Sequence, residues 1–315
     1  MTLLTGFAAQ LLHIALVLAA APTLIGVIQW IEARQAGRFG PSVLQPWRDL
    51  WRLFRKERVI AESASDVSSL APMVTAAAVA IAACIVPSFA LGMTFAPYAD
   101  LLVIAGLLAL ARASLALGGL DAGTALGGMG ASRTMALAVL SETALLLIIF
   151  VLALVAGSSN LDLIAAMQQE SGIDWRSGVS LGFAAMLLVA YVDSSRAPSQ
   201  RAELAMRRQA LEQEFSGRDL ALISATDSLR ILLWFDLLGA MFLPFGMAPS
   251  GTGPLAWLFG LACWLARTLL FALAIAIVPA VIGRLRLVRA ARMLGVAIAL
   301  ALLAVALLFA EMATA

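Results

Sequence analysis

The sequence predicts an all-α polytopic membrane protein with eight transmembrane helices and one amphipathic helix at the membrane surface. Three observations predict this fold. The 315 residues are 62% hydrophobic and only 13% charged, whereas soluble domains are nearer half apolar and about a quarter charged. The apolar residues form runs of about 20, long enough to cross a bilayer, and the charged residues cluster between them. Length alone would suggest two soluble domains, but the runs indicate a single membrane domain, residues 1–315.

Eight apolar runs are expected to form the transmembrane helices. Clusters of glycine and proline separate several of them. The first run has no basic segment before it and continues past any cleavage site, so a cleavable signal peptide is not expected. The spans cover about residues 3–30, 69–92, 98–120, 133–156, 178–193, 219–245, 254–283 and 287–312.

A basic island follows the first span, and an amphipathic helix is predicted within it at about residues 43–57. Its apolar side chains recur at helical spacing and form one stripe, and basic side chains fill the other face. Such a helix lies in the membrane interface. It either binds anionic lipid headgroups or docks a cytoplasmic partner. The basic residues of the island are Arg34, Arg38, Arg48, Arg52, Arg55, Lys56 and Arg58, and the stripe is Leu44, Trp47, Leu50, Trp51, Leu53 and Phe54.

Basic residues predict the orientation, because short cytoplasmic loops are enriched in lysine and arginine. Seventeen of the 21 basic residues fall in the loops after the first, third, fifth and seventh spans. The opposite side has only Arg176, and three more arginines lie within spans. Both termini are therefore expected on the outer side, with the loop at about 194–218 in the cytoplasm.

Six acidic or basic residues lie well inside the predicted spans, where charge is costly and usually functional. Asp227 and Arg230 are three residues apart on one helix face and are therefore able to pair. A static ion pair that fixes helix packing is the alternative to a functional role for these two. The six are Arg112, Glu142, Asp227, Arg230, Asp236 and Arg267.

A chain of carboxylates leading into the membrane is the arrangement that a proton relay requires. The stretch that adjoins the charged spans carries four further carboxylates, Asp193, Glu203, Glu212 and Glu214. The sequence therefore predicts a relay with Arg112 and Arg230 as counter-charges. Its predicted members are Glu142, Asp193, Glu203, Glu214, Asp227 and Asp236.

Other chemistries are not indicated. The chain has no G-x-S-x-G, H-E-x-x-H or P-loop motif, and Gly127–Gly130 is expected to form a tight turn or a close helix approach. Cys84 and Cys263 lie in apolar runs without a CxxC or histidine partner, so no metal or iron–sulfur cluster is expected in this chain. His13 is expected to be a packing residue. The basic loops contain no nucleic-acid-binding module.

Several motifs carry a family resemblance. The first is WIEAR, GRFGP and LQPWRDL between Trp30 and Leu50; the second is LDAGTALGGMGASR from Leu120 to Arg133. Ser141-Glu142 follows, and then EFSGRDLAL from Glu214 to Leu222. On these motifs the chain resembles the complex I subunit 1 family. It is most similar to the hydrogenase branch, the formate hydrogenlyase subunit 4 or hydrogenase-4 component C type. The resemblance covers nearly the whole chain, and the family has eight helices.

The resemblance implies a membrane-anchor and proton-coupling subunit of a complex I-like oxidoreductase related to the group 4 nickel–iron hydrogenases, without catalytic activity of its own. It would contact a hydrogenase-like large subunit and an iron–sulfur small subunit and link them to antiporter-like membrane subunits. A nickel–iron centre and iron–sulfur clusters would belong to those partners. The implied location is the bacterial inner membrane, with periplasmic termini. The docking residues would be Arg34, Arg38, Arg48, Arg52 and Arg55.

The sequence also departs from the family pattern. A glutamate expected early in helix six is Ser224, one expected in helix seven is Pro279, and a His-Glu pair is replaced by Arg208 and Gln209. These changes thin the acidic chain and keep open a purely structural anchor. Two further alternatives are a quinone-chamber subunit, with quinone at the first span and the amphipathic helix, and a stand-alone secondary transporter.

Overall fold

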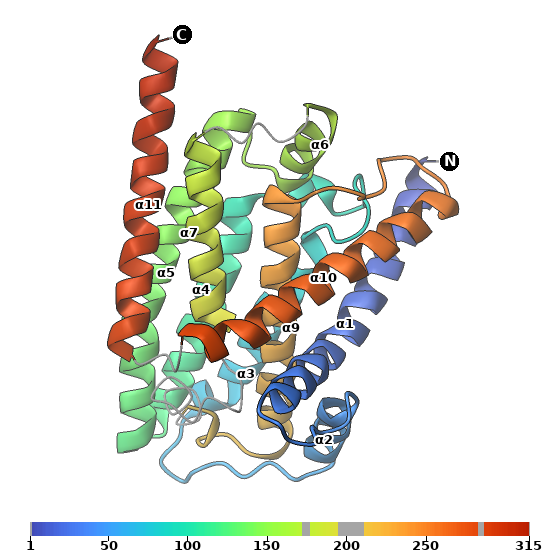
Figure 1. Cartoon of the computed structure of the whole chain (residues 1–315). Helices are drawn as coiled ribbons and strands as arrows, with labels where there is room; N and C mark the ends of the chain where they lie inside the picture. Colours follow the sequence, from blue (N-terminus) through green and yellow to red (C-terminus); the bar gives the residue numbers. More distant parts are fainter. Residues whose placement is uncertain (1, 172–176, 195–210, 283–286, 315) are drawn as a thin grey trace.

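A computed structural model describes residues 2–171, 177–194, 211–282 and 287–314, and within them the chain is helical (Figure 1). The only β pairings among these residues are two isolated bridges, Ala90 with Ala248 and Asp100 with Asn160. The elements are α1 (Thr2–Gln35), α2 (Gln45–Phe54), α3 (Asp66–Ile85), η1 (Ala96–Tyr98), α4 (Leu101–Asp121), α5 (Ala125–Ala156), α6 (Leu161–Ser171), α7 (Ser177–Ser194), α9 (Gly217–Phe242), α10 (Pro254–Ile282) and α11 (Leu287–Thr314).

Six of the described helices, α1, α3, α4, α5, α10 and α11, are long and apolar enough to cross a membrane. This confirms an all-α polytopic membrane protein. Helix α7 is apolar but shorter. Helix α9 has 26 residues, about 39 Å at 1.5 Å per residue, but it carries Asp227, Arg230 and Asp236. A helix therefore lies at each of the eight predicted spans, and the count of eight crossings stays a prediction.

Helix α9 occupies the centre of the bundle (Figure 1). It packs against α1, α2, α3, α6, α7 and α10, and every residue from Ser228 to Phe242 is buried. Helix α11 lies at one edge beside α5 and α7, whereas α10 runs obliquely across α1 at the other. The most polar of the long helices is thus the one most enclosed by protein, since charged side chains avoid lipid.

The two short helices mark opposite ends of the bundle (Figure 1). Helix α2 lies at one end, against α1 and α9, and α6 lies at the other. Both chain termini are at the α6 end, as an even number of crossings requires. The predicted basic island and the two termini are therefore on opposite ends of the molecule.

Helix α3 ends at Ile85, so the prediction that this span continues to residue 92 is wrong. Val86 is extended, with φ −70° and ψ 121°, because the ring of Pro87 disfavours the α conformation in the residue before it. The following loop pairs with the segment after α9: Leu91 N donates to Ala248 O at 2.9 Å, and Ala248 N donates to Phe89 O at 2.8 Å.

Helix α5 begins at Ala125, so the prediction that this span starts at residue 133 is also wrong. Thr124 caps the helix by accepting a hydrogen bond from Gly127 N at 3.0 Å. A Cβ added at Gly127 would lie 2.2 Å from Gly119 O of α4. The glycines therefore permit the close approach of two helices, a common use of glycine in membrane bundles.

Helix α6 was not predicted, because the segment between the fourth and fifth spans was read as a loop. Its first turn is fixed by Asp162, whose carboxylate accepts hydrogen bonds from Gly92 N at 3.1 and 3.2 Å. Burial raises the pKa of this carboxyl, and the hydrogen bond from Gly92 opposes the rise. Gln168 and Gln169 then donate to the backbone at the end of α9, on Met241 O and Pro244 O.

Candidate functional site

A network of charged side chains joins four helices inside the bundle. Arg112 of α4 lies in its middle, and its side chain is 4% exposed. Its Nη1 donates to Ser141 Oγ at 2.8 Å and to Glu142 Oε1 at 3.2 Å, both on α5. Its Nη2 lies 3.5 Å from Asp193 Oδ1 on α7. One arginine therefore bridges two of the predicted relay carboxylates.

Helix α9 completes the network around Asp193. Arg230 Nε lies 3.3 Å from Asp193 Oδ2, and Trp234 donates its indole N–H to the same oxygen at 2.5 Å. The sequence predicts Arg230 as a counter-charge. Its contact with Asp193 joins two different helices, α9 and α7, so helix periodicity does not reveal it. Asp227, one turn earlier on α9, is partly buried.

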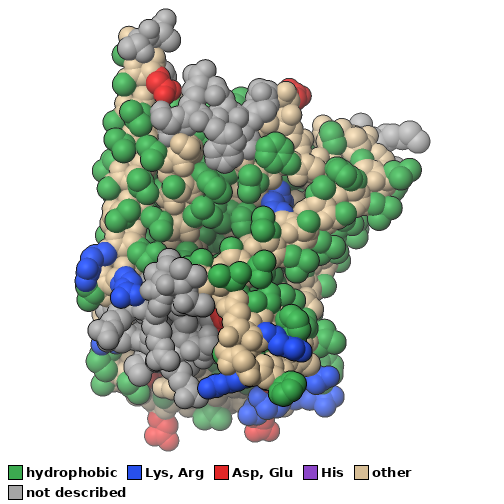
Figure 2. Space-filling model, viewed as in Figure 1, with side chains coloured by type: hydrophobic (Ala, Val, Ile, Leu, Met, Phe, Trp, Pro, Cys, Tyr) green, Lys and Arg blue, Asp and Glu red, His purple; other side chains and the backbone are tan. Residues whose placement is uncertain are grey.

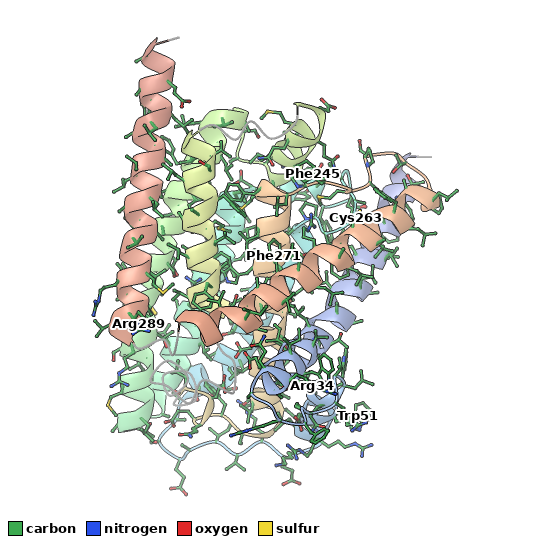
Figure 3. All side chains as sticks on the ribbon, in the orientation of Figure 1. Arg34, Trp51, Phe245, Cys263, Phe271 and Arg289 are labelled. Carbon is green, nitrogen blue, oxygen red and sulfur yellow. The ribbon has the colours of Figure 1, made fainter. Side chains whose placement is uncertain are left out.

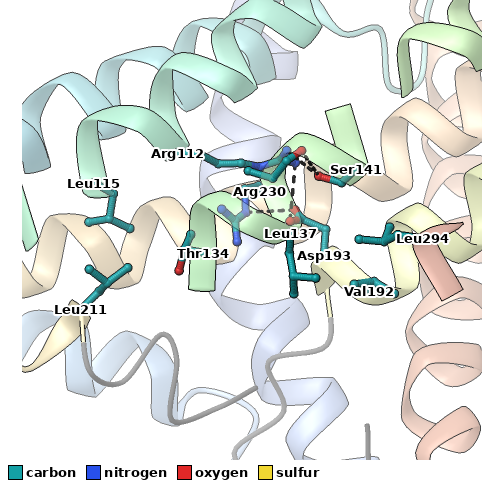
Figure 4. A pocket seen from close by; sticks show the side chains of 11 residues that line it. Arg112, Leu115, Thr134, Leu137, Ser141, Val192, Asp193, Leu211, Arg230 and Leu294 are labelled. Carbon is teal, nitrogen blue, oxygen red and sulfur yellow. Dashed lines mark hydrogen bonds and ion pairs between the residues drawn. The ribbon is translucent and has the colours of Figure 1, made fainter. Parts of the chain in front are cut away.

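A small cavity of about 40 Å³ adjoins the network (Figure 4). Arg112, Ser141, Asp193 and Arg230 line its polar side. The cavity has polar partners on one side and room for two or three water molecules, since one needs about 10–15 Å³. Its remaining wall is mostly apolar and consists of Leu115, Thr134, Leu137, Ala138, Val192, Leu211 and Leu294.

The network is electrically balanced, with two arginines and two carboxylates. Arg112, Arg230 and Asp193 are 4%, 8% and 15% exposed, whereas 31% of the Glu142 side chain is exposed. Removing one member of such a set leaves an uncompensated buried charge, which typically costs about 3–5 kcal/mol.

A second polar cluster surrounds Asp236, further along α9. The carboxylate accepts the indole N–H of Trp264 on α10 at 2.7 Å. Arg267 of α10 donates to Leu243 O at 2.8 Å and to Ser88 O at 2.9 Å. His13 contacts Ser88 Oγ at 2.7 Å and Ala83 O at 2.9 Å and is fully buried.

Glu214 lies apart from these clusters. Glu214 precedes α9 and accepts a short hydrogen bond from the Thr124 hydroxyl at the start of α5. It lines a smaller pocket of about 10 Å³ with Arg58 and Asp219, which form an ion pair at 2.5 Å. Glu203 lies outside the described residues. The structure thus joins Glu142 and Asp193 but leaves Glu214 and Asp236 in separate sites.

The predicted docking arginines lie at the α2 end of the molecule. Figure 2 shows basic side chains gathered there among apolar ones, and Figure 3 places Arg34 and Trp51 at this corner. Arg34 and Arg55 stack on Trp30 and Trp51, each with its guanidinium carbon 5.0 Å from the ring centre. Arg38, Arg48 and Arg52 are exposed.

Sequence reasoning missed three parts of the site: Ser141, the two tryptophans, and the pair of Arg58 with Asp219. A signal existed for Trp234, because it lies within a polar span and a buried indole N–H needs an acceptor. No local signal marks Arg58, since its partner is more than 150 residues away along the chain.

Comparisons with known proteins identify relatives over most of the chain. The family model described as NADH dehydrogenase matches residues 8–310. Hydrogenase-4 component C of Escherichia coli (strain K12) is 31% identical over 233 residues, 72% of each chain. Formate hydrogenlyase subunit 4 of the same organism is 30% identical over 274 residues, 85% of this chain and 84% of that one.

A solved structure shares the fold. A chain of the membrane-bound sulfane sulfur reductase, an archaeal respiratory membrane complex, superposes with a TM-score of 0.76 at 20% identity. The superposition covers 95% of this chain and 99% of that one. The two chains therefore share one arrangement of helices over nearly their full lengths.

Proposed function

This chain belongs to the NADH dehydrogenase family, the family of complex I subunit 1, and from that premise we propose that it anchors a hydrogenase-related redox arm and couples it to proton movement. It is an embedded, multi-pass membrane subunit of the complex I-like type. The observation that carries the coupling proposal is the Arg112 network, which connects α4, α5, α7 and α9 within the bundle. Redox centres, a nickel–iron site and iron–sulfur clusters, would reside in partner subunits.

The proposed relay step moves a proton between Glu142 and Asp193. Arg112 contacts both carboxylates but has no acceptor to carry a proton itself. Water would carry the proton between Asp193, which lines the adjoining cavity with Ser141, and Glu142, which follows Ser141 on α5: the O–H bond of one carboxyl breaks as that of the other forms. Arg112 then stabilises whichever acid is left ionised, which limits the cost of charge in the membrane.

The partial exposure of the Glu142 side chain supports the proposal that another membrane subunit packs beside α5. Its side chain is 31% exposed although it lies near the middle of the apolar helix α5, where contact with lipid would be costly. An antiporter-like subunit that packs on this face of α5 would cover it and continue the proton path. Glu203, Glu214, Asp227 and Asp236 are proposed as further proton-exchanging groups of the relay.

The proposed orientation has the α2 end in the cytoplasm of a bacterium and both termini in the periplasm. The positive-inside rule supports it, because α2 and its flanking loops are rich in exposed arginine. In this orientation the redox arm, with its hydrogenase-like large subunit and iron–sulfur small subunit, would dock on Arg34, Arg38, Arg48, Arg52 and Arg55.

The test replaces each network acid with its neutral amide in the assembled complex. Glu142→Gln and Asp193→Asn keep side-chain shape but remove proton exchange, so we expect redox-driven proton movement in sealed vesicles to fall at least tenfold. Asp66→Asn, an exposed acid at the start of α3, is the matched control and should leave it unchanged. Redox activity with artificial electron donors should persist in all three.

Wild-type proton movement in both network variants would refute the relay and leave a purely structural anchor. Loss of the redox subunits from the complex in the variants, with no change in protons moved per electron in what remains, would point to the same conclusion.

A further inference from the structure

The two oxygens of the Asp193 carboxylate have unequal surroundings. Trp234 is fully buried, and its N–H donates to Oδ2 at 2.5 Å. Arg230 Nε faces the same oxygen at 3.3 Å. Oδ1 faces only the longer ion pair with Arg112, at 3.5 Å, among the contacts of the described residues. Oδ2 is therefore the more fully occupied acceptor.

A protonated carboxyl carries its hydrogen on one oxygen. A proton added to Oδ2 would compete with the Trp234 N–H and lie against the Arg230 guanidinium, whereas among the described residues Oδ1 accepts no hydrogen bond and faces only Arg112. We infer that Trp234 is a positioning residue of the relay: with Arg230 it occupies Oδ2 and leaves Oδ1, the oxygen toward Arg112 and Glu142, to take and release the proton. This inference rests on the proposed relay.

The same arrangement recurs at the second cluster, which argues against a chance contact. A buried indole N–H needs some acceptor, and a backbone carbonyl would satisfy it. Trp264 also donates to a carboxylate, that of Asp236, at 2.7 Å, whereas Arg267, three residues further along α10, donates to backbone carbonyls. Asp193 and Asp236 thus each accept the N–H of a buried tryptophan.

The charged groups around Asp193 come from three other helices. Arg112 reaches it from α4, Glu142 lies beyond Arg112 on α5, and Arg230 comes from α9. On the side of α11 the residue that lines the cavity is Leu294. These charged groups remain in the Trp234→Phe variant, so the test compares pH dependence with and without the indole N–H alone.

The test is Trp234→Phe in the whole complex, reconstituted in sealed vesicles. Phenylalanine keeps a buried aromatic ring but removes the N–H, so the ionised carboxylate loses one donor. Asp193 then holds its proton more firmly. We expect the pH dependence of redox-driven proton movement to shift upward by about one pH unit, since a hydrogen bond to a charged group contributes on that scale.

Trp257→Phe is the matched control. Trp257 is partly buried on α10, and its indole contacts no acid among the described residues. Its replacement makes the same chemical change and should leave the pH dependence at the wild-type position. A Trp234→Phe profile that coincides with wild type, or a rate lowered equally at every pH, would show a merely structural role and overturn the inference.

A second measurement does not use the Trp234→Phe variant. Ultraviolet resonance Raman spectra of wild type minus Asp193→Asn should contain an indole N–H hydrogen-bond signal that changes with pH over the range in which proton movement changes. A pH-independent difference spectrum would overturn the inference. The proposed function fails separately, if Asp193→Asn itself moves protons normally; an inactive Asp193→Asn beside an unshifted Trp234→Phe would defeat the positioning role alone.

Discussion

Single residues decide how charge is held within the bundle. Arg267 joins α10 to the end of α9 and to the loop after α3 through hydrogen bonds to Leu243 O and Ser88 O. It fits there because α9 has no side chain at Gly239. A Cβ at Gly239 would lie 2.4 Å from Arg267 Nε and 2.5 Å from its Cζ. A glycine on one helix therefore positions an arginine on another.

We predict that Gly239→Ala destabilises the protein by about 1–3 kcal/mol, the usual cost of overpacking. The guanidinium would have to move away from two carbonyls that then lose buried partners. Thermal unfolding in detergent measures the effect. Gly106→Ala is the control, because a Cβ at Gly106 meets open space and alanine favours the helix. Equal stability of the two variants would contradict the packing argument.

Individual helices carry more than two faces, and α2 is the example. The apolar stripe predicted from its spacing is expected to face the membrane domain at the membrane interface. Only Leu50 of that stripe is buried, at 7% exposure, whereas Trp51 is 64% exposed and Trp47 and Phe54 are 40% and 41% exposed. The stripe is therefore buried against the protein only at Leu50, and the interfacial position of the helix stays a prediction. Helix α2 presents a narrow packing side, an exposed aromatic side and an exposed basic side.

Charge reversal on the basic side of α2 distinguishes the two interpretations of this helix, which are partner docking and lipid-headgroup binding. If it docks the redox arm, Arg48→Glu, Arg52→Glu and Arg55→Glu together should release the arm subunits while the chain stays in the membrane. The introduced glutamates would repel a partner surface that is complementary to arginine, so the amount of arm subunits that co-purify should fall at least tenfold. Retention of the arm would indicate that these arginines bind lipid headgroups.

The control for that experiment lies at the other edge of the bundle. Arg289 and Arg292 are exposed at the start of α11, and Figure 3 shows Arg289 far from Arg34 and Trp51. Reversal of these two charges should leave the arm attached. The pair Arg52–Asp49, at 3.2 Å with both side chains largely exposed, is too solvated to alter the expectation.

The whole molecule is arranged around its most polar long helix. The apolar helices form the wall, and α9 is enclosed, so that Arg230 and Asp236 are buried in protein. Both termini lie at the end opposite α2. This arrangement is consistent with eight crossings and predicts that the two ends of the bundle face different compartments.

Cysteine accessibility tests that topology. In a background with Cys84 and Cys263 replaced by alanine, Ser250→Cys at the α6 end should react with an impermeant maleimide in right-side-out vesicles. Glu62→Cys at the α2 end should react only in inverted ones. Both positions are exposed. The reverse pattern would refute the orientation, and labelling of both from one side would refute the prediction that the two ends of the bundle face different compartments.

The sequence by itself determined the membrane class, the positions of the long helices and the identity of the charged residues inside them. These features follow from local hydropathy and residue type, which need no knowledge of neighbours. Local pattern was less reliable at helix ends. Pro87 ended α3 early, and the glycines near Gly127 were read as a break although they lie within a helix.

Tertiary structure decided which of those residues meet. Glu142, Asp193 and Arg230 come from α5, α7 and α9, and only packing around Arg112 brings them together. The same holds for the indole of Trp234, whose acceptor is 41 residues away. The physical reason is that hydropathy depends on a residue's own side chain, whereas an ion pair or hydrogen bond depends on the distance between atoms of different helices, which the rotation and depth of every helix set jointly.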